Sequence, residues 1–279
     1  MKTRIVTLAL LALFVPLLAG CGKEPTAPSA AKTAPALPPA TSAKFDFGFF
    51  QRTGGAQAFA AHPEGVKSTE AKSNWINAAV RVIFINLTVA DLFSAPVLAL
   101  DAALQQTPVL GDDGWYVWRY SFTDKGHAIS LRLRARIDGA VVTWQMYASD
   151  PQAQPVLQDF LWFTGESRLT NDRGFWVFND LRDAQTIPVA RIDWNNASAT
   201  RRSLVFSNIE TGSADLGDRL EYQLDGSIAS VLFHDASEHQ EADIQWNEST
   251  GTGSLQVPDY NGGLRACWDE RQENMVCTQ

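Results

Sequence analysis

The feature that most constrains the fold of this 279-residue chain is a pair of tight turns set among alternating apolar residues. Asp138-Gly139 is typical of a two-residue hairpin loop, and Thr123-Asp124-Lys125-Gly126 is a second turn signal upstream. In the segments that flank these turns, apolar side chains recur at every second position, which is the period of a β-strand with one buried face. The stretch from Trp115 to Ser149 therefore predicts a three-stranded antiparallel meander.

The position of the hairpin tip predicts the register of this meander. With Asp138-Gly139 at the tip, Leu133 faces Trp144, and the upstream turn places Trp118 beside Leu131. Every pair on this face is apolar, as a half-buried sheet requires. The opposite face carries three arginines in one row, Arg132, Arg134 and Arg136. A slip of one residue would bury all three charges, so the pattern determines which face is buried.

Most of the chain after Gly114 has the pattern of β structure. Asp225-Gly226 marks another hairpin, whose register would pair Tyr222 with Ala229. No long helical segment separates the strands, so the sheet should be antiparallel. Beyond the meander, strands are expected near residues 157–164, 174–179, 188–195, 202–210, 217–224, 227–235, 241–247, 253–257, 264–268 and 274–278.

Two helices are predicted ahead of the sheet, near residues 69–106. From Thr69 to Ser94, polar residues follow one narrow stripe at helical spacing and most other positions are apolar, which favours a largely buried helix. The β-branched run 80–85 leaves a strand as the alternative there. Pro96 suits the first turn of a second helix that ends near Gln105.

Residues 1–20 have the features of a signal peptide. Lys2 and Arg4 supply a short positive segment, and residues 5–17 form an apolar stretch too short to span a bilayer comfortably. Without Lys2 and Arg4, the formal net charge changes from −8 to −10. So acidic a chain is a poor candidate for nucleic acid binding, and charge alone would not draw it to anionic lipid.

The sequence Leu18-Ala19-Gly20-Cys21 follows the apolar stretch. Here the chain resembles bacterial lipoprotein precursors, whose lipobox has this sequence or a close variant. The resemblance implies cleavage before Cys21, acylation of Cys21 and attachment to a membrane of the bacterial cell envelope through this lipid anchor. Gly22 rather than Asp then favours the outer membrane. An ordinary secretory signal with an incidental cysteine is the alternative.

The segment behind Cys21 has the composition of a tether. Residues 21–44 contain many Ala, Pro, Thr and Ser and show no apolar periodicity, which predicts a disordered or polyproline-like linker. Residues 45–279 are then expected to form a single β domain. The phenylalanines at its start, from Phe45 to Phe50, suit a short strand or an aromatic segment that docks on the domain.

With Cys21 assigned to lipid, Cys267 and Cys277 are left to pair with each other. An export route delivers them to an oxidising compartment, so a disulfide is expected. The polar residues 269–274 between them suit the tip of a last hairpin. A metal site is the weaker alternative, because no second Cys or His pair with ligand spacing lies nearby.

Two predicted strands are apolar on both faces. A strand of that kind needs a cover on each side, and the helices could supply one of them. A curved sheet or a bound apolar ligand could supply the other. The side chains concerned are Phe160, Trp162, Trp176 and Phe178.

The combination of lipobox, linker, early helices and many antiparallel strands resembles the half-barrel lipoproteins and lipid carriers of the LolA, LolB and LppX kind. The likeness concerns architecture alone and transfers no functional residue. We therefore expect a mainly β fold with an N-terminal helical pair, in which a large antiparallel meander sheet curves into a half-barrel. A two-sheet β-sandwich is the alternative.

The sequence contains no strong catalytic or metal-binding signal. Gly165-Glu166-Ser167-Arg168-Leu169 lacks the closing Gly of a nucleophile elbow. His234-Asp235 and Glu238-His239 form the nearest approach to a metal cluster, but a polar loop is the favoured interpretation. Paired carboxylates such as Asp112-Asp113 arise readily in an acidic chain. No catalytic residue, metal or cofactor is therefore expected.

The arginine row is the polar feature most suited to binding. Arg132, Arg134 and Arg136 would lie roughly 7 Å apart on one face, with Trp115 beside them. Forked hydrogen bonds and stacking could hold a carboxylate, a phosphate or a sugar acid there. A solvated face that prevents aggregation, neutralised by acidic loops, is the competing interpretation.

These patterns favour a non-enzymatic envelope lipoprotein that binds an apolar or amphipathic ligand, such as lipid, in a concave aromatic-lined sheet. A β-sandwich module that binds carbohydrate or another envelope component is the first alternative. A hydrolase with carboxylates on loops is the second. No protein partner is indicated.

Overall fold

The computed structural model describes residues 33–67, 70–124, 126–181 and 185–277. The chain divides into two compact units, Met1–Thr33 and Ala34–Gln279. Every helix and strand described below belongs to the second unit. Cys21 and the predicted signal peptide lie outside the described residues.

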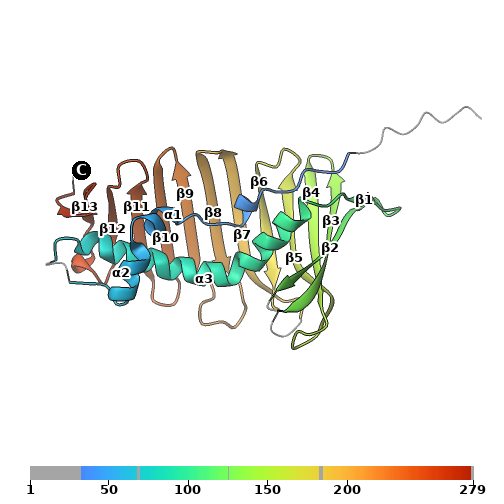
Figure 1. Ribbon diagram of the computed structural model, residues 1–279, viewed down its shortest axis with the longest axis horizontal. Helices are drawn as coiled ribbons and strands as arrows, with labels where there is room; N and C mark the ends of the chain where they lie inside the picture. Colours follow the sequence, from blue (N-terminus) through green and yellow to red (C-terminus); the bar gives the residue numbers. More distant parts are fainter. Residues whose placement is uncertain (1–32, 68–69, 125, 182–184, 278–279) are drawn as a thin grey trace, which may run out of the picture. The chain divides into compact units, whose positions relative to one another are not determined.

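The second unit is built on one antiparallel sheet in which the spatial order of the strands is their order in the chain (Figure 1). This open meander confirms the mainly β, antiparallel fold, and it is one sheet where the sandwich alternative needs two. The curvature of a half-barrel stays a prediction. The strands are β1 (Val109–Leu110), β2 (Tyr116–Asp124), β3 (His127–Asp138), β4 (Val141–Asp150), β5 (Leu157–Arg168), β6 (Arg173–Asn179), β7 (Pro188–Ser198), β8 (Arg201–Asn208), β9 (Arg219–Asp225), β10 (Ile228–Asp235), β11 (Gln240–Asn247), β12 (Gly253–Gln256), β13 (Ala266–Trp268) and β14 (Asn274–Met275).

The predicted register is wrong by two residues, whereas the predicted faces are correct. Leu133 pairs with Met146, and Asp138 pairs with Val141, so the two-residue loop is Gly139-Ala140. Gly139 has φ +59° and occupies the first loop position, as in a type II′ turn. Because side chains alternate with a period of two, this shift leaves every residue on its predicted face.

The same two-residue shift recurs at the other predicted turns. Trp118 pairs with Leu133 rather than with Leu131. Tyr222 pairs with Val231 rather than with Ala229, because Gly226 occupies the first position of its loop. The strands from β2 to β14 lie within four residues of their predicted bounds, and β1 is too short to show an alternating pattern.

The helical layer consists of η1 (Ala40–Ser42), α1 (Gly48–Arg52), α2 (Gly55–Ala61) and α3 (Ser73–Ala103), and a further 3₁₀ turn, η2 (Asn261–Gly263), precedes β13. The β-branched run 80–85 is helical, so the favoured prediction of a helix is confirmed over the strand alternative. The predicted helical pair is one helix, α3, bent by 62° between Ser73–Thr88 and Phe93–Ala103. Pro96 lies inside it, where its ring opposes the carbonyl of the residue four positions earlier and bends the helix instead of ending it.

Residues 34–44 correct the predicted tether, because they pack on the sheet. Trp176 Nε1 donates a hydrogen bond to Ser42 Oγ at 3.1 Å, and Asn171 Nδ2 donates to the Leu37 carbonyl. Pro, Ala and Ser gave this segment the composition of a linker, but two distant side chains hold its polar groups. The phenylalanines that follow form a docked aromatic segment that leads into α1, and they are buried: Phe45, Phe47, Phe49 and Phe50.

The core lies between the helical layer and one face of the sheet, which we name the helical face. α3 runs along the sheet and contacts β2 at one end and β12, β13 and β14 at the other (Figure 1). Three tryptophans on this face each stand opposite a glycine in the neighbouring strand, in the pairs Gly165–Trp176, Gly174–Trp194 and Gly253–Trp268. The absent Cβ of each glycine leaves the space that the ring occupies.

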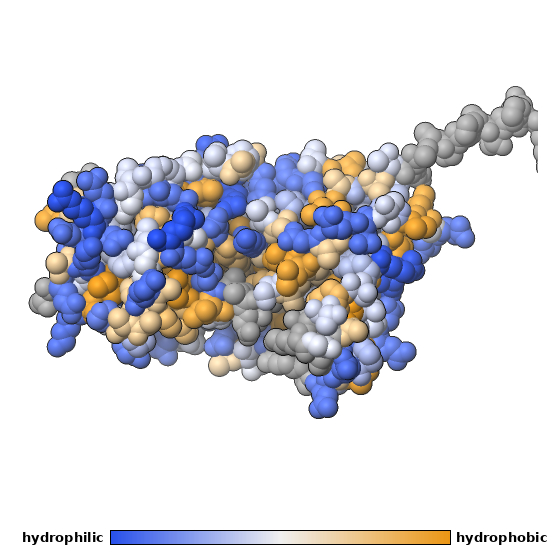
Figure 2. Space-filling model, viewed as in Figure 1, coloured by the Kyte–Doolittle hydropathy of each residue, from blue (hydrophilic) through white to orange (hydrophobic). Residues whose placement is uncertain are grey.

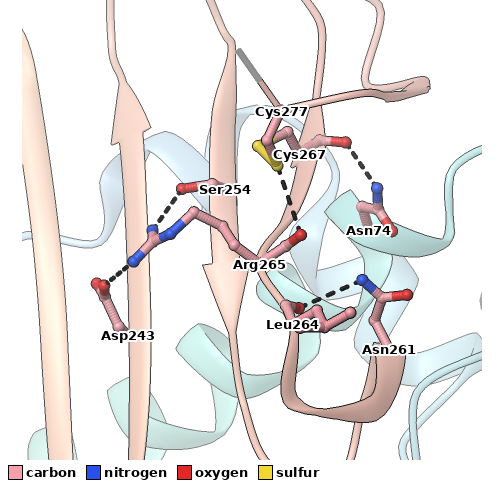
Figure 3. Close-up of a disulfide and its surroundings, with 8 residues drawn as sticks. All are labelled: Asn74, Asp243, Ser254, Asn261, Leu264, Arg265, Cys267 and Cys277. Carbon is pink, nitrogen blue, oxygen red and sulfur yellow. Dashed lines mark hydrogen bonds and ion pairs between the residues drawn. A yellow bond between two sulfur atoms is a disulfide. The ribbon is translucent and has the colours of Figure 1, made fainter. Parts of the chain in front are cut away.

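The C-terminal hairpin caps α3. Cys267 and Cys277 form the predicted disulfide. Asn274 Oδ1 accepts a hydrogen bond from the Asn74 N–H at 3.0 Å, in the role of an N-cap side chain, and Asn74 Nδ2 donates to the Cys267 carbonyl (Figure 3). Tyr260 donates to Asn74 Oδ1. The start of the helix is therefore tied to the end of the chain.

Candidate functional site

An apolar groove of about 320 Å³ lies where α3 bends over the N-terminal segment. This volume is near the lower limit for sites that bind small molecules. Its walls are mostly apolar, and three polar residues, Lys44, Asn86 and Ser94, belong to its lining. The lining residues are Ala43, Lys44, Phe45, Asn86, Phe93, Ser94, Val97 and Leu98.

The α3 wall of the groove is fixed by aromatic contacts with the sheet. Phe93 is buried, and its ring packs edge-on against Phe178 and Phe206, with centroids 5.1 and 5.6 Å away. Tyr120 donates a hydrogen bond to the Ala99 carbonyl one turn and a half further along. Burial raises the pKa of the Tyr120 hydroxyl, so it stays a donor. These contacts hold the bent helix against β2, β6 and β8.

The wall formed by residues 43–45 is fixed by an ion pair with the sheet. Asp46 Oδ2 lies 2.9 Å from the guanidinium of Arg202 on β8. Burial raises the pKa of Asp46, but the Gly48 N–H and Arg202 lower it by more, so the net pKa is below the ordinary carboxyl value. Phe45 packs edge-on against Tyr222, with centroids 6.3 Å apart. The groove therefore lies between two segments that are each fastened to the sheet.

The four aromatic residues predicted to line a concavity are buried, with 7% of Phe160, 6% of Trp162, 1% of Trp176 and 6% of Phe178 exposed. None belongs to the described lining of the groove, although Phe178 supports it through Phe93. A β-bulge explains the apolar run. The register shifts between Met146 and Tyr147, so Phe160 and Phe163 both pair with inward-facing residues of β4.

The predicted arginine row is assembled on the opposite face of the sheet, which we name the open face. Arg132 makes a two-pronged ion pair with Asp159 and stacks on Tyr147, 4.0 Å from the ring centroid. Arg134 pairs with Asp113 at 2.6 Å and stacks on Trp115.

Arg136, the third residue of the row, also lies over Trp115, at 5.1 Å. Asp159 near the start of β5 and Asp113 in the loop before β2 therefore occupy the guanidinium groups of Arg132 and Arg134, in the arrangement of a neutralised surface. Binding of an external anion at the row stays a prediction.

A larger hollow, of about 460 Å³, lies on the open face over β9 to β12. Its three acidic side chains already have partners, because Glu221 pairs with Arg219, Glu241 with His234 and Asp243 with Arg265. The larger hollow is therefore a polar surface whose acidic groups are paired, whereas the smaller groove beneath α3 is lined mostly by apolar side chains. The remaining lining residues are Gln223, Ser230, Leu232 and Gln256.

The described carboxyl groups with shifted pKa values do not have the character of a general acid. Hydrogen bonds from the Thr170 hydroxyl and from the Glu238 N–H lower the pKa of Asp172 and of Asp235, respectively. A glycosidase acid needs a pKa raised toward neutrality. Within the described residues, no group of three or more His, Cys, Asp or Glu side chains is placed to hold a metal ion.

Sequence reasoning missed the groove. Its walls come from two segments about 50 positions apart, and neither carries a motif. The signal that could have indicated it is Pro96 inside a helical stretch, because the helix bends by 62° just ahead of it, between Thr88 and Phe93.

Comparison with protein-family models, with curated proteins and with solved structures found no match to this chain.

Proposed function

We propose that this protein is a non-enzymatic lipoprotein of the bacterial envelope, acylated at Cys21, whose β domain binds an amphipathic ligand in the groove beneath α3. The observation that carries the proposal is the chemistry of the groove. Ala43, Phe45, Val97 and Leu98 offer an acyl chain apolar contacts, and the exposed Lys44 beside them offers a cation to an anionic head group.

The proposed ligand site differs from the concave aromatic sheet expected from the sequence. Phe160, Trp162, Trp176 and Phe178 support the core, and the bend of α3 supplies the apolar space. Carbohydrate binding has less support, because the tryptophans of the helical face are buried and Trp115, half-buried on the open face, is stacked with Arg134 and Arg136.

Acylation is tested by replacing the proposed anchor residue. The variant Cys21→Ser is expected to lose the diacylglycerol mass and to remain uncleaved or to become soluble, because no thiol is left to accept the lipid. Mass spectrometry and detergent partitioning of the two proteins check this result. Lipid mass on the Cys21→Ser protein would show that the lipobox interpretation is wrong.

Ligand binding is tested by filling the groove. Ser94 is exposed and lines the groove, so Ser94→Trp should occupy the acyl-chain space and weaken palmitate binding at least tenfold without lowering the denaturation midpoint. The matched control is Thr88→Trp, which adds the same ring at an exposed position of α3 outside the lining. Isothermal titration and native mass spectrometry measure the binding.

A second variant tests the head-group assignment. Lys44→Gln should weaken palmitate binding several-fold and leave hexadecanol binding unchanged, because only the carboxylate loses its cation. Equal palmitate affinity for the parent protein, Ser94→Trp and Thr88→Trp would contradict the groove as the site.

A further inference from the structure

The outward side of α3 exposes large apolar side chains. The exposed fractions are 62% for Phe84, 54% for Leu87 and 58% for Leu98. We name these three residues the α3 patch. Figure 2 shows hydrophobic side chains on the surface along the band where α3 crosses the domain. Exposed apolar side chains gathered on one element in this way mark a contact with another molecule or with a membrane.

The patch is continuous with the groove, because Leu98 belongs to both. The groove therefore opens on the side of the domain that carries exposed apolar side chains. The open face of the sheet has the opposite character, since it carries the ion pairs of Arg132, Arg134 and Arg265. The apolar α3 patch and the arginine ion pairs thus lie on opposite sides of the sheet.

The inward side of α3 packs against protein. Val82, Phe93, Ala99 and Leu100 are buried in the core between helix and sheet. In the described part of the chain, no single helix is long and apolar enough to cross a membrane. The two bent arms of α3 reach that length and apolar composition only when they are taken together. A helix with one side committed to a protein core can offer its other side to a membrane surface.

We propose that the α3 patch lies against the bilayer that holds the lipid anchor, so that the groove opens toward the acyl chains of that bilayer. This inference rests on the proposed function. We choose a bilayer as the contact of the α3 patch because the segment between the proposed lipid anchor and the domain is short. Twelve residues lie between Cys21 and Ala34, and the fully extended chain from one to the other spans at most about 45 Å.

The start of the domain also favours a membrane over a protein partner. Segment 34–45 lies on the helical face, where residues 43–45 meet α3 at the groove. A lipid anchor joined to this segment would keep the bilayer within reach of the side that carries the patch. The formal charge of −10 without the signal segment gives no electrostatic attraction to anionic lipid, so contact with a membrane has to be apolar.

The test places one fluorescent label on the patch and one on the open face. Leu87→Cys and Gln245→Cys, both at exposed positions, are each labelled with a nitrobenzoxadiazole dye on the full acylated protein. The paired Cys267 and Cys277 do not react. The proteins are reconstituted into phosphatidylcholine vesicles, with and without doxyl-labelled lipid, and recovered by flotation.

At position 87 we expect blue-shifted emission, at least threefold protection from dithionite and quenching by doxyl lipid. At position 245 we expect none of these. A label at 87 that is as accessible to dithionite as the label at 245, in protein that floats, overturns the docking inference alone.

A label at 87 that is shielded from dithionite but not quenched by doxyl lipid would assign the patch to a second copy or another protein, and also overturns the inference. Protein that fails to float overturns the lipid anchor and the docking inference together.

Discussion

Replacing Trp176 by Ala is expected to lower the free energy of unfolding by about 3–5 kcal/mol. The ring is 1% exposed, packs edge-on against Phe163 with centroids 5.5 Å apart, and donates a hydrogen bond to Ser42. Its loss leaves a cavity over Gly165 and a buried hydroxyl without its donor. Urea denaturation followed by circular dichroism measures the change.

Two further substitutions act as controls for Trp176→Ala. Trp115→Ala makes the same chemical change on the open face, where the ring is half-buried, and should cost well under half as much. Trp176→Phe keeps most of the packing and should cost about 1–2 kcal/mol, chiefly through the Ser42 hydrogen bond. A nearly unchanged stability of Trp176→Ala, together with lost palmitate binding, would instead make Trp176 a wall of the ligand site.

Adding one methyl group at Gly165 is expected to cost on the order of 3 kcal/mol. A Cβ built at Gly165 lies 2.3 Å from the Phe175 carbonyl oxygen and 2.4 Å from a ring carbon of Trp176, closer than real contacts allow. The variant Gly165→Ala therefore has to move β5 away from β6 or displace the ring. The denaturation midpoint and slope in urea measure the cost.

The control for Gly165→Ala is Gly139→Ala, where a Cβ meets nothing within 4 Å and only the positive φ of +59° is strained. That strain should cost about 1 kcal/mol. In the double variant Gly165→Ala with Trp176→Phe, the smaller ring should relieve the overlap, so the combined loss should be less than the sum. Additive losses would show that the ring does not fill the space above the glycine.

The alternation of apolar residues predicted the strands and their faces but not their register. A shift of one residue would have buried Arg132, Arg134 and Arg136, so the pattern excluded it. A shift of two preserves every face, and the choice depends on which loop position the glycine occupies. An Asp-Gly sequence is compatible with glycine at the first or at the second position of the two-residue loop. In the structure, Gly139 and Gly226 each occupy the first position.

The parts of the candidate site that could not be predicted depend on contacts between distant segments. The alternation of side chains along the strand placed the arginine row on the correct face of the sheet. Its carboxylate partners, Asp113 and Asp159, lie in or near loops, whose paths no periodicity describes. Likewise, residues 34–44 have the composition of a linker, and their order comes from Trp176 and Asn171. The groove exists only because that ordered segment meets the bent helix.

The cap on α3 couples the start of the helical layer to a segment that is synthesised much later. Within the sheet, each strand pairs with its neighbour in sequence, so strands can join as they emerge, with short loops to close. The Asn74 N–H, in contrast, donates its hydrogen bond to Asn274, which lies 200 positions further along the chain. A chain that stops before Asn274 therefore keeps most of its strand pairs but lacks both the cap and the disulfide. In such a fragment the first turn of α3 lacks its Asn274 partner, so local unfolding and proteolysis are expected to begin at that turn.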